Sequence, residues 1–159
     1  MSELKFLKIG DKAPSFIGKN QNGETLYSSD LVNKKWAIYF YPKDNTPGCT
    51  MQACNIRDNY DILTKEGITI IGVSADSETS HQKFIEKQNL PFTLLADVEK
   101  EIIKAYGVWG NKKFMGKEYD GIHRTTFIVN EKGIIIGIIE KPKTKAHAEE
   151  ILEIFKNNN

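Results

Sequence analysis

Short apolar runs rich in β-branched and aromatic residues recur along the 159 residues, separated by longer stretches of helical character. Such runs are typical of buried strands, and they occupy residues 36–41, 68–73, 92–95, 125–129 and 134–139. The helical stretches are residues 47–66, 77–88, 98–106 and 145–156. Strands that alternate with helices need crossover connections, which place helices on both faces of a partly parallel sheet. The pattern therefore predicts an α/β fold with a central mixed sheet flanked by helices.

Glycine-containing turns divide the remaining segments. The dipeptide Asn22-Gly23 predicts an N-terminal β-hairpin, and residues 130–133 predict a hairpin turn between the last two strands. Gly67 and Gly107 each follow a helical stretch, where glycine commonly ends a helix. Residues 108–123 have a weak period and three glycines, so we expect a long surface loop of the kind that often carries function.

Length and charge limit the partners and the compartment. A chain of 159 residues is long enough for one domain with its own core, so we expect residues 1–159 to form a single domain. The 22 basic and 21 acidic residues provide no basic field for a nucleic-acid backbone. Charges interrupt the apolar residues at the N-terminus, and no segment approaches the roughly 20 apolar residues that cross a bilayer. We therefore expect a cytoplasmic protein without nucleic-acid or membrane partners.

The chain has two cysteines, Cys49 and Cys54. Two are too few for a disulfide scaffold, and the cytosol keeps thiols reduced. A disulfide between them would therefore be catalytic rather than structural. The alternative for Cys49 is a small buried hydrophobic residue, but the prolines around it and the second thiol nearby favour a reactive sulfur.

Residues 42–54 connect a buried strand to a helix. Pro42 and Pro47 make the connection a turn, with Thr46 as a good N-cap and Pro47 at the first helical position. Cys49 then lies in the first helical turn, where unpaired N–H groups and the helix dipole favour the nucleophilic thiolate. The Thr46 hydroxyl, the Cys49 N–H and a nearby guanidinium are candidates for stabilising charge during a displacement.

The spacing of the two cysteines has a geometric consequence. Five residues along a helix place the Cα atoms of Cys49 and Cys54 roughly 8.6 Å apart and about 140° around the axis. A disulfide does not form beyond about 7 Å without backbone movement. If both cysteines are helical when reduced, the helix must unwind locally before they can be joined.

Pro42, Thr46 and Cys49 form the pattern P-x-x-x-T-x-x-C, which resembles the peroxiredoxins, a family of thiol peroxidases built on the thioredoxin fold. The longer run YFYPKDNTPGCTMQAC, residues 39–54, is similar to the bacterioferritin comigratory protein or peroxiredoxin Q group. The resemblance continues through FTLLAD at 92–97, YGVWG at 106–110 and GIHRTTFIV at 121–129. It covers nearly the whole chain and implies a thioredoxin-like fold.

The resemblance implies a role for five residues. Cys49 matches the peroxidatic cysteine, and Cys54 matches the resolving cysteine of this group. Thr46 matches the threonine that hydrogen-bonds the peroxide, and Pro42 matches the proline that shields the pocket. Arg124 matches the arginine that stabilises the thiolate and the transition state.

The same resemblance implies the reaction and its partners. Cys49 would reduce hydrogen peroxide and organic hydroperoxides, and its sulfenic acid would condense with Cys54 into an intramolecular disulfide. Thioredoxin or a similar dithiol protein would recycle that disulfide, in the service of antioxidant defence. Many members of the group act as monomers, so a monomer is expected, and the chemistry needs no cofactor.

Other polar and aromatic residues give weaker signals. His81, His123 and His147 are scattered among different elements, and the cysteine spacing does not match a structural zinc pattern, so no metal site is expected. Arg57 could reach the pocket, although a solvated helix face is the simpler expectation. Trp109 could either wall the pocket or anchor its loop on apolar surface.

Two other functions remain open from the residues alone. One is a disulfide oxidoreductase of the thioredoxin type, although those enzymes normally use C-x-x-C and position 52 is Gln52. The other is a non-enzymatic redox sensor whose disulfide between Cys49 and Cys54 changes binding to a partner protein.

Overall fold

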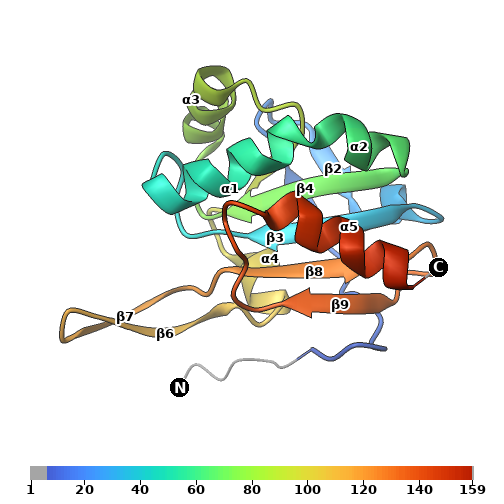
Figure 1. Ribbon diagram of the computed structural model, residues 1–159. Helices are drawn as coiled ribbons and strands as arrows, with labels where there is room; N and C mark the ends of the chain where they lie inside the picture. Colours follow the sequence, from blue (N-terminus) through green and yellow to red (C-terminus); the bar gives the residue numbers. More distant parts are fainter. Residues whose placement is uncertain (1–6, 159) are drawn as a thin grey trace.

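The computed structural model describes residues 7–158 and contains a five-stranded central sheet (Figure 1). In spatial order its strands are β5 (Thr93–Ala96), β4 (Ile68–Ser74), β3 (Lys35–Phe40), β8 (Thr125–Val129) and β9 (Ile135–Ile139). β4 is parallel to β3 and β5, whereas β8 is antiparallel to β3 and β9. The predicted mixed sheet is confirmed, and every strand lies within one residue of its expected bounds.

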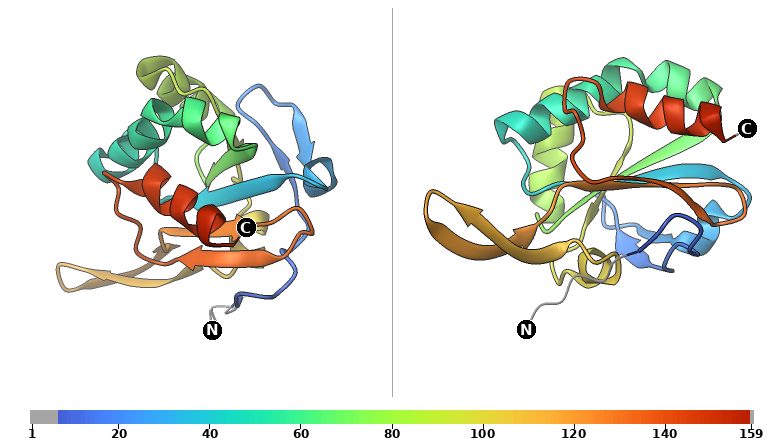
Figure 2. Two further views of the ribbon diagram at one scale, coloured as in Figure 1. Left: turned by 45° about the vertical axis from the view of Figure 1, so that its right-hand side comes forward. Right: turned by 60° about the horizontal axis from the view of Figure 1, so that its bottom comes forward.

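Helices cover both faces of this sheet. They are α1 (Pro47–Asp58), α2 (Tyr60–Lys65), α3 (Glu78–Gln88), α4 (Glu101–Ala105) and α5 (His147–Asn157). α1, α2 and α5 lie over one face, and α4 lies on the opposite face together with the chain from Leu7 to Leu31 (Figure 2). α3 packs on the same side as α1, because its Phe84 joins the apolar cluster there. None of the helices in residues 7–158 is long and apolar enough to span a membrane.

The predicted N-terminal hairpin is present. β1 (Ile17–Lys19) and β2 (Thr25–Tyr27) pair antiparallel, and a short 3-10 helix, η1 (Ser28–Leu31), follows. Gly23 has a φ of 76° in the turn, a conformation that glycine adopts without strain. Phe16, just before β1, joins the apolar cluster on the α4 side of the sheet.

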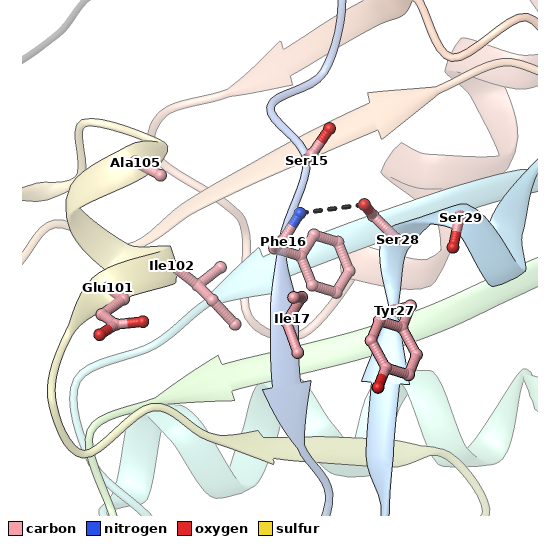
Figure 3. A pocket seen from close by; sticks show the side chains of 9 residues that line it. All are labelled: Ser15, Phe16, Ile17, Tyr27, Ser28, Ser29, Glu101, Ile102 and Ala105. Carbon is pink, nitrogen blue, oxygen red and sulfur yellow. Dashed lines mark hydrogen bonds between the residues drawn. The ribbon is translucent and has the colours of Figure 1, made fainter.

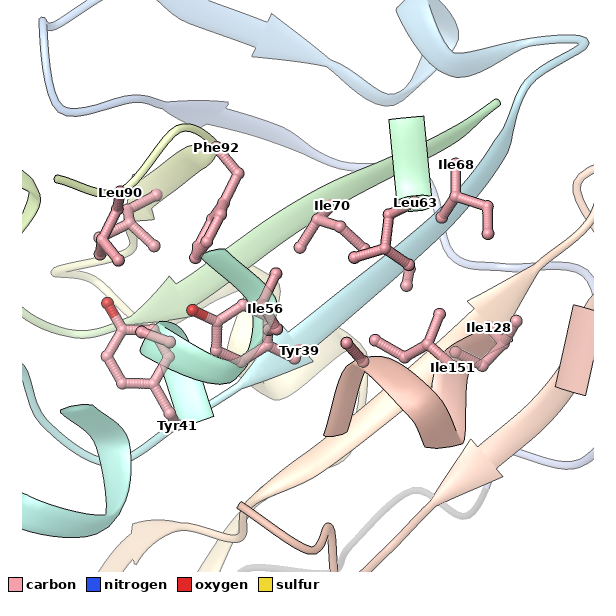
Figure 4. Close-up of a cluster of buried hydrophobic side chains, with 14 of the residues drawn as sticks. Tyr39, Tyr41, Ile56, Leu63, Ile68, Ile70, Leu90, Phe92, Ile128 and Ile151 are labelled. Carbon is pink, nitrogen blue, oxygen red and sulfur yellow. The ribbon is translucent and has the colours of Figure 1, made fainter. Parts of the chain in front are cut away.

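The strand that leads to Cys49 is buried on both faces, as its apolar sequence predicts. Tyr39, and Tyr41 just beyond the strand, belong to the cluster beneath α1. Ile38 and Phe40 alternate with them and belong to the cluster on the α4 side. Figure 4 shows Tyr39 and Tyr41 packed close to Ile56 of α1. β3 is therefore a fixed support for the helix that carries both cysteines.

Two predicted helices are wrong in extent. Residues 47–66 form α1 and α2 because the chain breaks at Asn59, which has φ −112° and ψ 12°. The Asn59 side chain donates to the Asn55 carbonyl oxygen at 2.8 Å, taking the acceptor that a continuing helix would use. Residues 98–106 shorten to α4 because Lys100, with φ 63°, is left-handed at its N-terminus.

The prediction of a loop at residues 108–123 is wrong, because this segment forms a β-hairpin. β6 (Trp109–Phe114) and β7 (Lys117–Ile122) pair antiparallel and project beyond the central sheet (Figures 1 and 2). Met115 (φ 52°) and Gly116 (φ 80°) form the two-residue turn, and positive φ at both positions matches a type I′ turn. Most of the hairpin side chains are exposed, so the sequence lacks the alternation of a half-buried strand, and Met-Gly is not a usual turn signal.

Candidate active site

The corner between β3 and α1 has the predicted geometry. Thr46 is the N-cap residue in an extended conformation, Pro47 begins α1, and Cys49 lies in the first helical turn. From the sequence we expected the Thr46 hydroxyl to cap the helix. It makes no capping bond and instead donates to the Lys43 carbonyl oxygen at 2.9 Å. The oxygen lone pairs of this partly exposed hydroxyl remain able to accept a hydrogen bond from a bound molecule.

Arg124 lies against the sulfur of Cys49. Its Nη2 is 3.2 Å from the Cys49 Sγ, although the two residues are far apart in sequence. Pairing of β3 with β8 sets Phe40 opposite Thr125, so the residue before β8 lies beside the end of β3. Gly48 allows the close approach, because a Cβ there would lie 3.3 Å from Arg124 Nη2.

Cys49 itself is only 1% exposed. Burial alone would agree with a small hydrophobic residue, but such a residue has no need of a guanidinium at its sulfur. The guanidinium of Arg124, a permanent positive charge, lies 3.2 Å from the sulfur, where it can donate to sulfur and to a bound molecule. Thr46, Gly48 and Arg124 around it are each partly exposed, so solvent reaches the surrounding groups.

Gln52 is a site residue that sequence reasoning missed. It is completely buried, and its Oε1 accepts a hydrogen bond from Arg124 Nη1 at 2.6 Å. One turn beyond Cys49, it lies on the same face of α1 and holds the second arm of the same guanidinium. Its Nε2 is buried without a partner. The available signal was a polar residue three positions after the cysteine on a helix face that has to be buried.

Cys54 lies in the last part of α1, and neither cysteine is in a disulfide. The half-buried Cys54 donates from Sγ to Gln88 Oε1 at 3.4 Å, at the end of α3. Both cysteines are therefore helical, which is the condition under which a disulfide between them needs local unwinding.

Arg57 does not take part in the site around Cys49. Its Nε donates to Asp58 at 3.0 Å and its Nη1 donates to the Gln88 carbonyl oxygen at 2.7 Å. The expected solvated helix face is therefore only half right, because one end of the guanidinium fastens α1 to α3.

The turn before Thr46 is anchored by a buried carboxylate. Asp44 accepts a hydrogen bond from the Tyr41 hydroxyl at 2.6 Å and pairs with His81 of α3 at 2.7 Å. Its N–H donates to Asp76 at 2.9 Å. Pro42 lies half-buried within this turn. These bonds fix the chain on the N-terminal side of Cys49 to α3 and to the segment after β4.

Asp44, Asp76 and His81 bring three metal-binding side chains within 4.8 Å of one another, the one such group found among residues 7–158. Hydrogen bonds join Asp44 to His81 at 2.7 Å and to Asp76 at 2.9 Å, and the Ser74 hydroxyl donates to Asp76 at 2.6 Å. His147 lies elsewhere, bonded to Thr126 at 2.7 Å. The cluster is thus explained as the anchor of the turn.

The base of the β6–β7 hairpin adds positive charge near the site. Lys112 donates to the Ile122 carbonyl oxygen at 2.9 Å, and desolvation, followed by repulsion from Arg124, lowers the pKa of its ammonium group. Trp109 packs against the apolar cluster on the α4 side, with Lys100 Nζ 5.1 Å from its ring centre. Of the two roles expected for Trp109, these contacts match the anchor.

Tyr39 lies beneath α1 with a hydroxyl that is buried and has no partner. Burial, and next the nearby Cys49, raise the pKa of this phenol well above its usual value. The Tyr39 hydroxyl is therefore neutral at any working pH and adds no negative charge beside the sulfur.

The cavity drawn in Figure 3 lies on the other face of the sheet and is not part of this site. It has a volume of about 480 Å³ between the N-terminal hairpin and α4. Phe16, Ile17, Tyr27 and Ile102 form its apolar wall, and the other lining residues are three serines, Glu101 and Ala105. No cysteine lines it, so the thiol chemistry belongs to the β3–α1 corner.

Comparison with known proteins places this geometry in a family. Residues 9–138 match the AhpC/TSA family. The chain is 46% identical over 151 residues to peroxiredoxin Bcp of Bacillus subtilis, covering 95% of this chain and 96% of that protein. It is similar to a PrxQ mutant from Xylella fastidiosa, with a TM-score of 0.90 at 30% identity and coverage of 97% and 98%.

A second solved structure is the bacterioferritin comigratory protein of Xanthomonas campestris, described in a study of its alkyl peroxide reduction activity. The TM-score is 0.84 at 31% identity, covering 90% of this chain and 91% of that one. The residues matched by the family, 9–138, include the β3–α1 corner and Arg124. The chain therefore belongs to the AhpC/TSA family and, within it, to the Bcp and peroxiredoxin Q group of peroxiredoxins, which are thiol peroxidases.

Proposed function

We propose that Cys49 is the peroxidatic cysteine of this thiol peroxidase. The observation that carries the assignment is the 3.2 Å contact between its sulfur and Arg124 Nη2. The thiolate attacks the terminal oxygen of a hydroperoxide, so that an S–O bond forms as the O–O bond breaks. The departing oxygen takes up a proton and leaves as water or an alcohol, and Cys49 becomes a sulfenic acid.

The surrounding groups stabilise this displacement. Negative charge moves from the sulfur to the departing oxygen, and Arg124 is placed to follow it because Gln52 holds its other nitrogen at 2.6 Å. The Thr46 hydroxyl orients the peroxide, and Pro42 limits access of water to the reacting atoms. Fixed donors of this kind lose little free energy to reorganisation during the reaction.

Cys54 is the resolving cysteine in this proposal. Its sulfur attacks the sulfenic acid of Cys49, an S–S bond replaces the S–O bond, and the hydroxyl leaves as water with the Cys54 proton. Thioredoxin or a similar dithiol protein then reduces the disulfide by thiol exchange. α1 has to unwind for the two sulfurs to meet, since both cysteines lie within it.

The substrates proposed are hydrogen peroxide and organic hydroperoxides, for antioxidant defence. The reported alkyl peroxide reduction by the Xanthomonas campestris relative supports the organic class. We further propose that residues 1–159 act as one domain, as a monomer and in the cytoplasm. The near balance of 22 basic and 21 acidic residues supports a protein that has no nucleic-acid partner.

Steady-state reduction of hydrogen peroxide and cumene hydroperoxide, coupled to thioredoxin and its reductase, tests the assignment. Cys49→Ser should abolish turnover of both substrates. Cys54→Ser should consume one equivalent of peroxide and then stop unless a small thiol is supplied. Retained turnover in Cys49→Ser would exclude the proposed role of Cys49, and full recycling by thioredoxin in Cys54→Ser would exclude that of Cys54.

The other two functions are tested by the same system. A thioredoxin-type oxidoreductase would reduce insulin disulfides rapidly without peroxide, but Gln52, in place of a second cysteine, is bound to Arg124. A redox sensor would consume only one equivalent of peroxide per molecule, even with the thioredoxin system present. Catalytic peroxide loss together with slow insulin reduction would set both aside.

A further inference from the structure

The last turns of α1 are fastened to the end of α3 through one residue, Gln88. Its side-chain Oε1 accepts the hydrogen bond from Cys54 Sγ at 3.4 Å. Its carbonyl oxygen accepts a second bond, from Arg57 Nη1 at 2.7 Å. The thiol proposed to resolve the sulfenic acid is therefore held by a residue from a different helix.

Gln88 is held in place by the contacts of the residues that follow it. Asn89 ends α3 in a left-handed conformation with φ 54°, and Leu90 N–H closes the helix end by donating to Ile85 O at 3.1 Å. Leu90 and Phe92 then enter the apolar cluster beneath α1. These contacts support Gln88 in addition to its two bonds to α1.

The contact has to break in every catalytic cycle. Two helical residues five positions apart have Cα atoms roughly 8.6 Å apart, and a disulfide needs them within about 7 Å. Cys54 must therefore leave its helical position, and with it the Gln88 amide oxygen, before its sulfur reaches Cys49.

We infer that Gln88 is a latch for the resolving cysteine: a positioning residue that holds Cys54 in the helix and thereby limits the rate of disulfide formation. The inference rests on the proposed roles of Cys49 and Cys54. Resolution joins the Cys49 sulfenic acid to the Cys54 thiol and releases water, so it needs no reagent beyond the peroxide already consumed.

The latch also sets the fate of the sulfenic acid. While Cys54 remains bound to Gln88, a second hydroperoxide can oxidise the Cys49 sulfenic acid to a sulfinic acid, leaving water or an alcohol. Slow release of Cys54 favours this irreversible product, and fast release favours the disulfide. Gln88 is therefore a determinant of resistance to over-oxidation.

The experiment compares Gln88→Ala with wild type in single-turnover oxidation by hydrogen peroxide. Disulfide formation should be about two- to fivefold faster, the lower part of the range for one hydrogen bond, because a thiol is a weak donor. The fraction of sulfinic acid found by mass spectrometry at high peroxide should fall, while the second-order rate of Cys49 oxidation stays within twofold. Lys87→Ala, an exposed neighbour in the same helical turn, is the matched control and should behave as wild type.

Gln88→Glu separates the latch from a general loosening of α3. It keeps an oxygen acceptor for the Cys54 thiol, so disulfide formation should be as slow as in wild type or slower. An unchanged or slower rate in Gln88→Ala would overturn the latch, as would equal acceleration in Gln88→Glu or Lys87→Ala. If wild type forms no disulfide with Cys54, the proposed role of Cys54 fails as well, which the Cys54→Ser assay detects independently.

Discussion

The first turn of α1 and its last part each carry one cysteine, in opposite surroundings. The Cys49 sulfur lies 3.2 Å from a guanidinium, whereas Cys54 is half-buried and donates to a neutral amide oxygen. The first sulfur therefore has a charged donor beside it, whereas the second has a neutral acceptor. If Cys49 and Cys54 have the roles proposed above, one helix separates a sulfur that reacts in place from a sulfur that has to move.

The N-terminal and C-terminal halves of α1 are also attached to the rest of the protein by different kinds of contact. The N-terminal half is held by buried and charged contacts, those of Asp44 and Arg124. The C-terminal half is held by burial of Ile56, by the bonds to Gln88, and by the Asn55 side chain, which bonds Lys145 O before α5 and Ala148 N within it. Exposing one isoleucine side chain costs about 1.5–3 kcal/mol, which is in the range of local opening rather than global unfolding.

Removing the charge from the Cys49 half should produce the largest effect. Arg124→Met should lower the second-order rate of Cys49 oxidation by about a hundred- to a thousandfold, the usual loss when a transition-state donor is removed. Stopped-flow measurement with hydrogen peroxide checks this. Arg124→Lys should recover only part of the rate, because an ammonium cannot bind Gln52 and the sulfur with two nitrogens.

Lys113→Met, an exposed cation on β6, is the control for net charge and should leave the rate unchanged. If Arg124→Met lowers the rate of Cys49 oxidation less than fivefold, the contact of Arg124 with Cys49 does not distinguish the two halves of α1.

The buried amide that holds Arg124 should have a smaller effect. Gln52→Leu removes the 2.6 Å bond to Nη1, and hydrogen bonds to charged groups contribute enough for roughly a ten- to fiftyfold loss in the same rate. Gln52→Glu keeps an acceptor for the guanidinium and should restore most of it. Equal rates in Gln52→Leu and wild type would mean that Arg124 needs no second support.

Loosening the other half should reduce stability rather than the oxidation rate. Asn55→Ala removes the bonds to Lys145 O and to Ala148 N and should lower the free energy of unfolding by about 1–2 kcal/mol, measured by urea denaturation. Asn55→Asp keeps an acceptor for the Ala148 N–H at the start of α5 and should lose less. A slower oxidation of Cys49 in either variant would contradict the separation of the two halves.

Acid should weaken the packing of α5, through His147 at its start. Burial lowers the pKa of His147, the first residue of α5, below its ordinary value near 6.5. The unfolded chain then binds the proton first, so stability is fully present above pH 6.5 and is lost as pH falls toward the folded pKa. Urea denaturation at pH 7.5 and 5.5 should show this loss in wild type and a smaller one in His147→Gln. An identical loss in both would assign the effect to other groups.

Local sequence signals predicted the frame of the site. Pro42 and Pro47 marked the corner, and the apolar strand before them fixed where Cys49 would begin a helix. Arg124 was placed only by family resemblance, because its contact with Cys49 depends on the pairing of β3 with β8. No local pattern encodes that register.

The errors have the same origin. Residues 108–123 form a hairpin whose exposed side chains give no period. Gln52 and Gln88 were missed because their partners, Arg124 just before β8 and Cys54 on α1, are distant from them in sequence. Asn59 breaks the helix through a side-chain bond that competes with helix continuation.

The bond between Arg57 and Gln88 holds a trypsin cleavage site, the peptide bond before Asp58, in the last turn of α1. In the reduced protein the peptide bond after Arg57 is helical and its side chain is engaged at 2.7 Å, so the protease has no extended segment to grip. Unwinding toward the disulfide frees that bond, and cutting then follows the population of opened molecules. Limited digestion could therefore count oxidised molecules in a mixture without any label on the sulfurs.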